Sequence, residues 1–222
     1  MNHMRAVCVM FAFAASMLLG MTIAVTPANA ALITFNFTGT VTGVGSQLGT
    51  TTFSNGQTLS GSYTFNSATA DSNGGPTIGT YNGTISNLVV NIGSYNATLG
   101  AGSNSIDVKN LPMSDSYTMQ APFTGSTVNG RTPVSFGIDL TDPTHTAFSN
   151  DHLPTTPPSL ASFATDTFRL VFNGGPTGTV IGTLNSLTAV PLPAAVILFG
   201  AGLIALVGLG AGSWRQKRHS LA

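Results

Sequence analysis

Apolar and polar residues alternate along much of the chain between residues 31 and 190. Side chains of a strand point in turn to its two faces, so an alternation with a period of two predicts strands that are buried on one face. We find no sustained helical spacing in this region. The alternating apolar positions are Ile33, Phe35 and Phe37; Leu59, Tyr63 and Phe65 around Gly61; Leu88, Val90 and Ile92; Val134, Phe136, Ile138 and Leu140; and Phe168, Leu170 and Phe172.

Clusters of turn-forming residues separate these segments. Asn, Asp, Gly, Pro and Ser favour turns, and the spacing of the clusters predicts about eight to ten strands. We therefore expect an all-β ectodomain over residues 31–189, either an antiparallel β-sandwich or a jelly-roll-like fold. The clusters are Ser54-Asn55-Gly56, the six residues 71–76, Asn129-Gly130, and Asn173-Gly174-Gly175-Pro176.

The longest predicted connection without strand character covers residues 141–160. Long loops of compact domains often have a function, and this one contains Asp142, His145, Asp151 and His152. These residue types ligate divalent cations, but their spacing matches no common ligand pattern. The alternative is a solvated loop in which Asp142 and Asp151 cap turns. We expect this alternative, and therefore no metal site and no cofactor.

The residues for catalysis are also missing from the sequence. All seven acidic residues are Asp, and no pair of them stands out as the two carboxylates that glycoside hydrolysis needs. There is no Gly-x-Ser-x-Gly nucleophile motif. The single cysteine, Cys8, precedes the predicted domain, which therefore has no thiol site and no disulfide. We expect a protein that is not an enzyme, with no catalytic or cofactor-binding residues.

Charge is scarce and unevenly distributed. Only 6% of the residues are charged, and the formal net charge is zero. Residues 31–190 contain Lys109, Arg131 and Arg169 against seven Asp, a balance of −4. Nucleic acids are bound by clustered Lys and Arg, which this region lacks, so we expect no nucleic-acid partner.

The polar strand positions are mostly Thr, Ser and Asn. Such a face, with Tyr63, Tyr81, Tyr95 and Tyr117 taken as available for stacking, suits polysaccharide binding through hydroxyl groups and aromatic rings. It equally suits a hydrated surface of low charge that avoids unwanted contacts. We favour the second interpretation.

Residues 1–30 have the pattern of a secretory signal peptide. Arg5 lies in a short polar start, an apolar run follows over residues 6–25, and Ala28 and Ala30 provide the small side chains of a signal peptidase site. We expect cleavage after Ala30. The alternative is an uncleaved anchor, because the run is nearly long enough to span a membrane.

Residues 190–222 form a second segment that we predict lies outside the folded domain. Prolines at its start end any regular structure before it. The uncharged residues 194–214 would make a helix of about 31 Å, which matches a hydrocarbon core of about 30 Å. Residues 215–222 form a basic tail, which favours the cytoplasmic side, so the domain would face outward. The sorting motif is Val190, Pro191, Leu192, Pro193, Ala194 and Ala195, and the basic stop is Arg215, Lys217 and Arg218.

This order of proline motif, apolar span and basic cluster resembles the PEP-CTERM sorting signal. Pro191-Leu192-Pro193 stands where the family has Pro-Glu-Pro, and the whole motif resembles the Val-Pro-Leu-Pro-Ala-Ala variant. The resemblance implies a bacterial protein that is exported, held at the inner membrane by the C-terminal helix, and processed by an exosortase, a membrane-embedded cysteine protease and transpeptidase. It implies a final place at the cell surface or in the extracellular matrix, among extracellular polysaccharide.

Three hypotheses for the domain follow. The first is a non-enzymatic structural component associated with extracellular polysaccharide, whose processing partners are signal peptidase and the exosortase. The second is a carbohydrate-binding module or adhesin with a defined ligand. The third is a secreted hydrolase.

Overall fold

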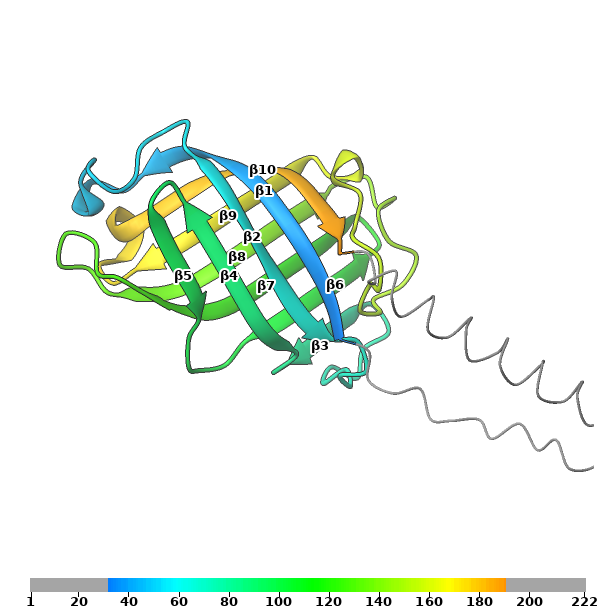
Figure 1. Cartoon of the computed structure of the whole chain (residues 1–222). Coiled ribbons are helices and arrows are strands. Elements are labelled where there is room, and N and C mark those ends of the chain that lie inside the picture. Colours follow the sequence, from blue (N-terminus) through cyan, green and yellow to red (C-terminus); the bar gives the residue numbers. More distant parts are fainter. Residues whose placement is uncertain (1–31, 191–222) are drawn as a thin grey trace, which may run out of the picture. The chain divides into compact units, whose positions relative to one another are not determined.

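The computed structural model describes residues 32–190, which form ten β-strands and three short 3-10 helices (Figure 1). All strand pairs are antiparallel, so the predicted all-β antiparallel class is confirmed. The strands are β1 (Leu32–Val44), β2 (Thr58–Asn66), β3 (Ile78–Asn82), β4 (Ile85–Ile92), β5 (Tyr95–Leu99), β6 (Ser105–Leu111), β7 (Ser114–Gly125), β8 (Pro133–Asp142), β9 (Thr165–Phe172) and β10 (Thr179–Ala189). The 3-10 helices are η1 (Ser46–Leu48), η2 (Leu160–Ser162) and η3 (Gly175–Gly178).

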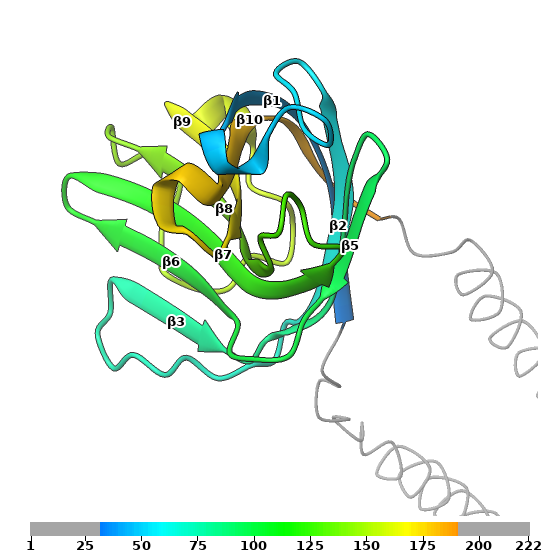
Figure 2. The same ribbon diagram turned by 90° about the vertical axis from the view of Figure 1, so that its left-hand side faces the viewer.

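Eight of the strands close into a barrel, in the order β7-β5-β4-β2-β1-β10-β9-β8 and back to β7. Figure 2 shows these strands around a common interior. The closing contact is short, because β5 meets β7 only through Ala97–Leu99 opposite Phe123–Gly125. The sequence predicted a sandwich or jelly roll with two sheets. The structure corrects that detail, since pairing of β5 with β7 and of β8 with β7 leaves no gap between two sheets.

Strands β6 and β3 branch from the barrel. The first part of β7 pairs with β6 and its last part with β5, so one edge of β7 serves two neighbours. Strand β3 then pairs with β6. The inward side chains of the branch, Tyr81, Ile106 and Val108, are buried, and the Tyr81 hydroxyl donates to the backbone oxygen of Asp151 at 3.0 Å. The branch and the loop after β8 therefore pack against each other.

Aromatic rings fill the barrel interior. The Phe37 ring of β1 stacks on the Phe136 ring of β8, with 5.3 Å between centroids. The Tyr63 hydroxyl of β2 lies 2.8 Å from the Tyr117 hydroxyl of β7. Burial raises the pKa of both hydroxyls, so both are protonated at neutral pH. Both contacts join strands that are not neighbours in the sheet, so the interior ties opposite walls together.

Inward-facing glycines make room for these rings. A Cβ added to Gly61 would lie 2.5 Å from the Phe37 ring, and one added to Gly182 would lie 2.4 Å from the Phe168 ring. Both distances are far below a normal contact. Small residues on β2 and β10 thus allow large ones on β1 and β9, as dense core packing requires.

The predicted alternation holds for most of the strand positions. The apolar residues of β2, β4 and β9 that the pattern placed inside are fully buried. Val134 differs, because it is 46% exposed while Phe136 and Ile138 on the same strand are buried. Its neighbours Pro133 and Ser135 flank a register shift against β9, so the side chain of Val134 leaves the inward face.

Both ends of the described chain lie at the same end of the barrel. Strand β1 starts there and β10 finishes there, with Phe35 opposite Ala189 and the Val190 amide donating to the Thr34 oxygen at 3.0 Å. The long loop between β8 and β9, over residues 143–164, lies at this end too (Figure 1). We call it the terminal end. The opposite end, which we call the distal end, has the loops after β1, β4, β7 and β9.

Within residues 32–190 no helix is long and apolar enough to cross a membrane. The apolar run of the predicted signal peptide, over residues 6–25, and the helix predicted over residues 194–214 lie outside the described residues. The same applies to the signal peptidase site at Ala28 and Ala30, to the sorting motif after Val190, and to the basic cluster at residues 215–218.

Candidate functional site

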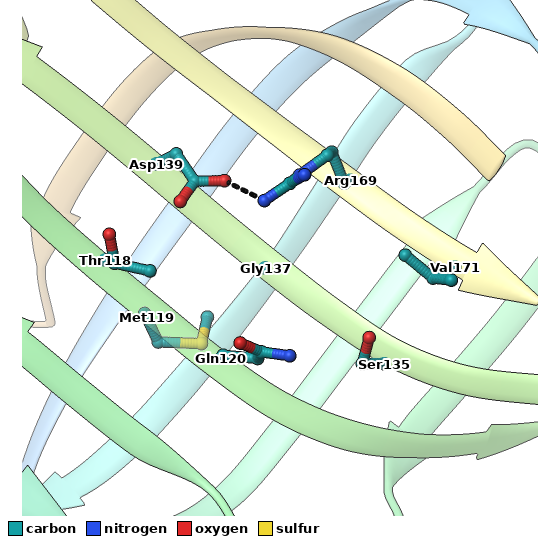
Figure 3. A pocket seen from close by; sticks show the side chains of 8 residues that line it. All are labelled: Thr118, Met119, Gln120, Ser135, Gly137, Asp139, Arg169 and Val171. Carbon is teal, nitrogen blue, oxygen red and sulfur yellow. Dashed lines mark hydrogen bonds and ion pairs between the residues drawn. The ribbon is translucent and has the colours of Figure 1, made fainter. Parts of the chain in front are cut away.

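A pocket of ≈ 120 Å³ lies on the outer face of the wall made by β7, β8 and β9. The strand register places Gly137 of β8 between Gln120 of β7 and Arg169 of β9, and Ser135 and Asp139 are its outward neighbours along β8. Because glycine has no side chain, the space above it stays open, and Figure 3 shows the surrounding side chains. We call this pocket the Gly137 hollow. It is lined by Thr118, Met119, Gln120, Ser135, Gly137, Asp139, Arg169 and Val171.

The backbone does not require glycine at the floor of the hollow. A Cβ added to Gly137 would have the Met119 backbone oxygen, at 3.5 Å, as its nearest neighbour, which is ordinary van der Waals contact. This differs from Gly61, whose Cβ would lie 2.1 Å from a backbone oxygen. A larger side chain at residue 137 would therefore fit the fold and fill the hollow.

An ion pair spans one side of the hollow. The Arg169 Nη2 donates to Asp139 Oδ2 at 2.9 Å, and the two side chains are 56% and 26% exposed. The pair cancels its own charge. A guanidinium has five N–H donors and a carboxylate several acceptor positions, so both groups retain hydrogen-bonding capacity toward solvent.

Other polar groups of the hollow have no partner within the described residues. The structure gives no hydrogen bond to the side chains of Thr118, Gln120 or Ser135 from residues 32–190. On the wall formed by β1, β2 and β10, by contrast, outward hydroxyls bond to each other or to an amide. These bonds are Thr34 to Thr64 at 2.8 Å, Thr38 to Ser186 at 2.6 Å, and Asn185 to Thr40 at 2.9 Å. The hollow is thus a place where polar side chains remain available to a ligand.

The four tyrosines that the sequence suggested for stacking are inside the protein. Tyr63 and Tyr117 are fully buried, and Tyr81 and Tyr95 are 5% and 4% exposed. The Tyr95 hydroxyl donates to the Ser126 backbone oxygen at 3.1 Å, and burial raises its pKa to about 12. The expectation of exposed tyrosines was wrong. All Phe and Tyr side chains of residues 32–190 are buried or half-buried.

The loop at residues 143–164 is fastened to the barrel by two buried carboxylates. Asp142, at the end of β8, accepts the backbone N–H groups of Thr144, Thr146 and Ala147 at 2.7, 2.7 and 3.0 Å. The hydroxyls of both threonines also donate to it, at 2.6 and 3.1 Å. These hydrogen bonds, above all that of the Thr144 hydroxyl, lower the pKa of Asp142 well below its ordinary value of 3.8. The prediction that Asp142 caps a turn is confirmed.

The second carboxylate was not identified from the sequence. Asp115 of β7 lies opposite Asp142 in the register and is fully buried. It accepts a hydrogen bond from His145 Nδ1 at 2.8 Å and from the Phe148 N–H at 2.8 Å. No described hydroxyl lies within hydrogen-bond distance of the other ring nitrogen of His145. The contacts of Asp115 with His145 and Phe148 therefore hold the loop against the barrel.

The remaining candidate ligands of the sequence lie apart. His152 is exposed and its backbone N–H bonds to the Asn150 side chain, while Asp151 is 7% exposed. Asp71 lies in the turn-forming cluster of residues 71–76. Its carboxylate accepts the N–H of Asn73 within that turn and the N–H of Thr80 in β3, both at 2.8 Å. No group of three His, Cys, Asp or Glu side chains suited to a metal ion occurs within residues 32–190.

Acid should loosen the loop. The folded pKa of Asp142 lies below its ordinary value of 3.8, so its stabilisation is present above about pH 4 and is lost as the pH falls further. We expect the thermal midpoint of unfolding to fall below about pH 4, and Asp142→Asn to have a lower midpoint at pH 7 with a weaker acid dependence. The measurement is thermal unfolding between pH 2 and 7. Asp107→Asn is the control, because Asp107 accepts only the Ser105 hydroxyl; an equal change in both variants would contradict the role of Asp142.

Sequence reasoning missed the hollow, although one sign of it was present. In the alternating run from Val134 to Leu140, Gly137 falls on the polar side between Ser135 and Asp139. Its neighbours Gln120 and Arg169 come from strands whose register the sequence does not reveal. No family model, curated protein or solved structure matches the chain.

Proposed function

We propose that this chain is an exported bacterial surface or matrix protein, delivered by its PEP-CTERM-like tail. In this proposal the domain of residues 32–190 is a non-enzymatic structural component of an extracellular polysaccharide layer. Signal peptidase and an exosortase process its two ends, and the C-terminal segment holds it at the membrane until then.

The observation that supports the proposal most is the uncharged outer surface of β1, β2 and β10. Its outward side chains are mainly Thr, Ser and Asn, and the hydroxyls bond across the strands. Paired hydroxyls rigidify the surface and still accept water, and the scarcity of charge limits attraction to ionic partners. Such a surface suits a protein that resides among hydrated, hydroxyl-rich polymers.

A carbohydrate-binding module or adhesin is the second candidate. The Gly137 hollow favours it, because polar groups without protein partners surround an open space there. A secreted hydrolase has less support. The Asp115 and Asp142 carboxylates are occupied by the loop that they hold, and an acid–base pair needs carboxyl groups that face a substrate.

Removal of residues 191–222 tests the sorting part of the proposal. We expect the shortened protein to be exported but no longer retained, so that it accumulates in the culture medium instead of at the cell surface. The measurement is immunoblotting of medium, surface and membrane fractions. Unchanged surface retention of the shortened protein would contradict the sorting assignment.

A second variant separates a sorting signal from a plain membrane anchor. Pro191→Ala combined with Pro193→Ala removes the motif and retains the apolar residues 194–214. We expect this variant to remain in the membrane fraction as an unprocessed form of higher mass. The control is Thr188→Ala, an exposed position just before the motif, which should be processed normally. Normal processing of the double variant would identify the tail as an anchor only.

A further inference from the structure

We infer that the Gly137 hollow binds a single sugar unit of a neutral polysaccharide through the hydroxyl groups of that sugar. The inference keeps the proposed location in a polysaccharide layer and develops the second candidate function, a carbohydrate-binding module, by naming a ligand class and a site. The inference depends only on residues 118–171, whereas the sorting proposal depends on the tail, so the two can be tested separately.

The chemistry of the hollow matches hydroxyl groups. A sugar hydroxyl donates one hydrogen bond and accepts others, so a site for it needs both kinds of partner. Arg169 supplies donors, Asp139 supplies acceptors, and the Gln120 amide supplies both. The ion pair at 2.9 Å uses Arg169 Nη2 and Asp139 Oδ2. Arg169 therefore keeps further N–H donors, and Asp139 keeps its second oxygen, for the hydroxyls of a sugar ring.

The charge of the site favours a neutral sugar over an anionic one. Arg169 is the only cation that lines the hollow, and Asp139 already neutralises it. The described region as a whole carries three cations and seven Asp, a balance of −4. A uronic acid or a phosphate would lose its hydration at Arg169 and meet Asp139 at the same place, without a second cation to compensate.

Each hollow contacts one sugar unit, and a polysaccharide offers many identical units to many copies of the protein. A volume of ≈ 120 Å³ accommodates part of one sugar ring and no longer segment. Its edge at Val171 offers a small apolar contact, but no Phe or Tyr ring of residues 32–190 is exposed for stacking. Affinity for a free monosaccharide should therefore be weak. Many protein copies on a surface can engage many units of one polymer, and avidity then gives firm attachment.

The decisive experiment fills the hollow. The full chain, purified in a polyoxyethylene detergent and immobilised at high density, is tested against dextran, galactomannan and xylan as neutral polymers and against alginate as an anionic one. We expect saturable binding of at least one neutral polymer, and a loss of at least about tenfold in affinity for Gly137→Val, which is about 1.4 kcal/mol or more. Valine suits a strand, and its Cβ meets no close neighbour at this position.

Two further variants make the result interpretable. Gln120→Ala removes an exposed amide from the hollow and should also weaken binding, while Thr98→Val removes an exposed hydroxyl from β5 on another wall and should not. Near-ultraviolet circular dichroism checks that each variant is folded. Absence of neutral-polymer binding, binding of alginate alone, or equal binding by wild type and both hollow variants would overturn the inference. None of these results would affect the sorting proposal, which the tail variants test separately.

Discussion

Replacement of Phe172 by alanine is expected to lower the free energy of unfolding by about 3–5 kcal/mol, the usual range for removing a buried phenylalanine ring. Phe172 of β9 is fully buried, and its ring centroid lies 5.8, 5.9 and 5.5 Å from those of Phe53, Tyr95 and Phe123. These rings come from the loop after β1 and from β5, β7 and β9. Loss of the central ring leaves a cavity that the fixed strands of a closed barrel cannot collapse to fill. Urea unfolding followed by circular dichroism measures the effect.

Ile181→Ala is the matched control. Ile181 is also a barrel residue, on β10, but its side chain points outward and is 45% exposed. Surface substitutions of this kind usually change stability by less than about 0.5 kcal/mol. If Phe172→Ala and Ile181→Ala had similar effects, the four rings at the distal end would not form a stabilising part of the core.

Removal of one hydroxyl from the buried Tyr63–Tyr117 pair is expected to destabilise the protein by about 1–3 kcal/mol, because the remaining hydroxyl stays buried without its partner. The two oxygens are 2.8 Å apart and both side chains are fully buried. Tyr63→Phe and Tyr117→Phe should each show this loss. The double variant should cost less than the two single losses added together, because it buries no orphaned hydroxyl.

Chemical unfolding of the four proteins in this double-mutant cycle measures the coupling between the two hydroxyls. Tyr95→Phe serves as a control for loss of a tyrosine hydroxyl, since the Tyr95 hydroxyl bonds to a backbone oxygen instead of another side chain. Additive losses in the cycle would mean that a water or another group replaces the missing partner, and would contradict a direct bond across the barrel.

The strands with large inward side chains were predictable from the sequence. Leu88, Val90 and Ile92 occupy every second position of their segment, and β4 buries all three. Closure of the sheet was not predictable, because a sandwich and a barrel show the same alternation. The barrel closes because three residues of β5 pair with the end of β7. That pairing depends on strand length and register, which the alternation does not reveal. Short strands such as β3 were missed, since five residues give too little pattern.

The alternation of apolar and polar residues in β2 assigns Tyr63 to the barrel interior. The alternation that put Leu59 and Phe65 inside also puts Tyr63 inside, so its assignment to an exposed face contradicted the pattern itself. Tyr81 lies on the short branch strand β3, whose five residues are too few for an alternation that would assign Tyr81 to one face. Its burial depends on contact with the backbone of Asp151, which is distant in the chain and known only from the fold.

The candidate site was only half accessible to sequence reasoning. The order Ser135, Gly137, Asp139 on one face of a strand is visible in the chain, and so is the absence of a side chain at its centre. Gln120 and Arg169 could not be assigned to the same place, because they reach it through the registers of β7 and β9 with β8. Asp115 was missed for the same reason, since only its register with Asp142 brings it to the loop.

The meeting of both chain ends at the terminal end gives the domain a polarity. A tether attached to either Leu32 or Val190 would hold the same pole toward its anchor, so cleavage at one end would not turn the molecule around. Under the proposed surface location, the opposite pole, with the Asn129-Gly130 hairpin turn, would be the part presented to other cells or to antibodies. An epitope inserted at that turn would therefore be accessible from outside, whereas one inserted in residues 143–164 would be shielded by the surface below.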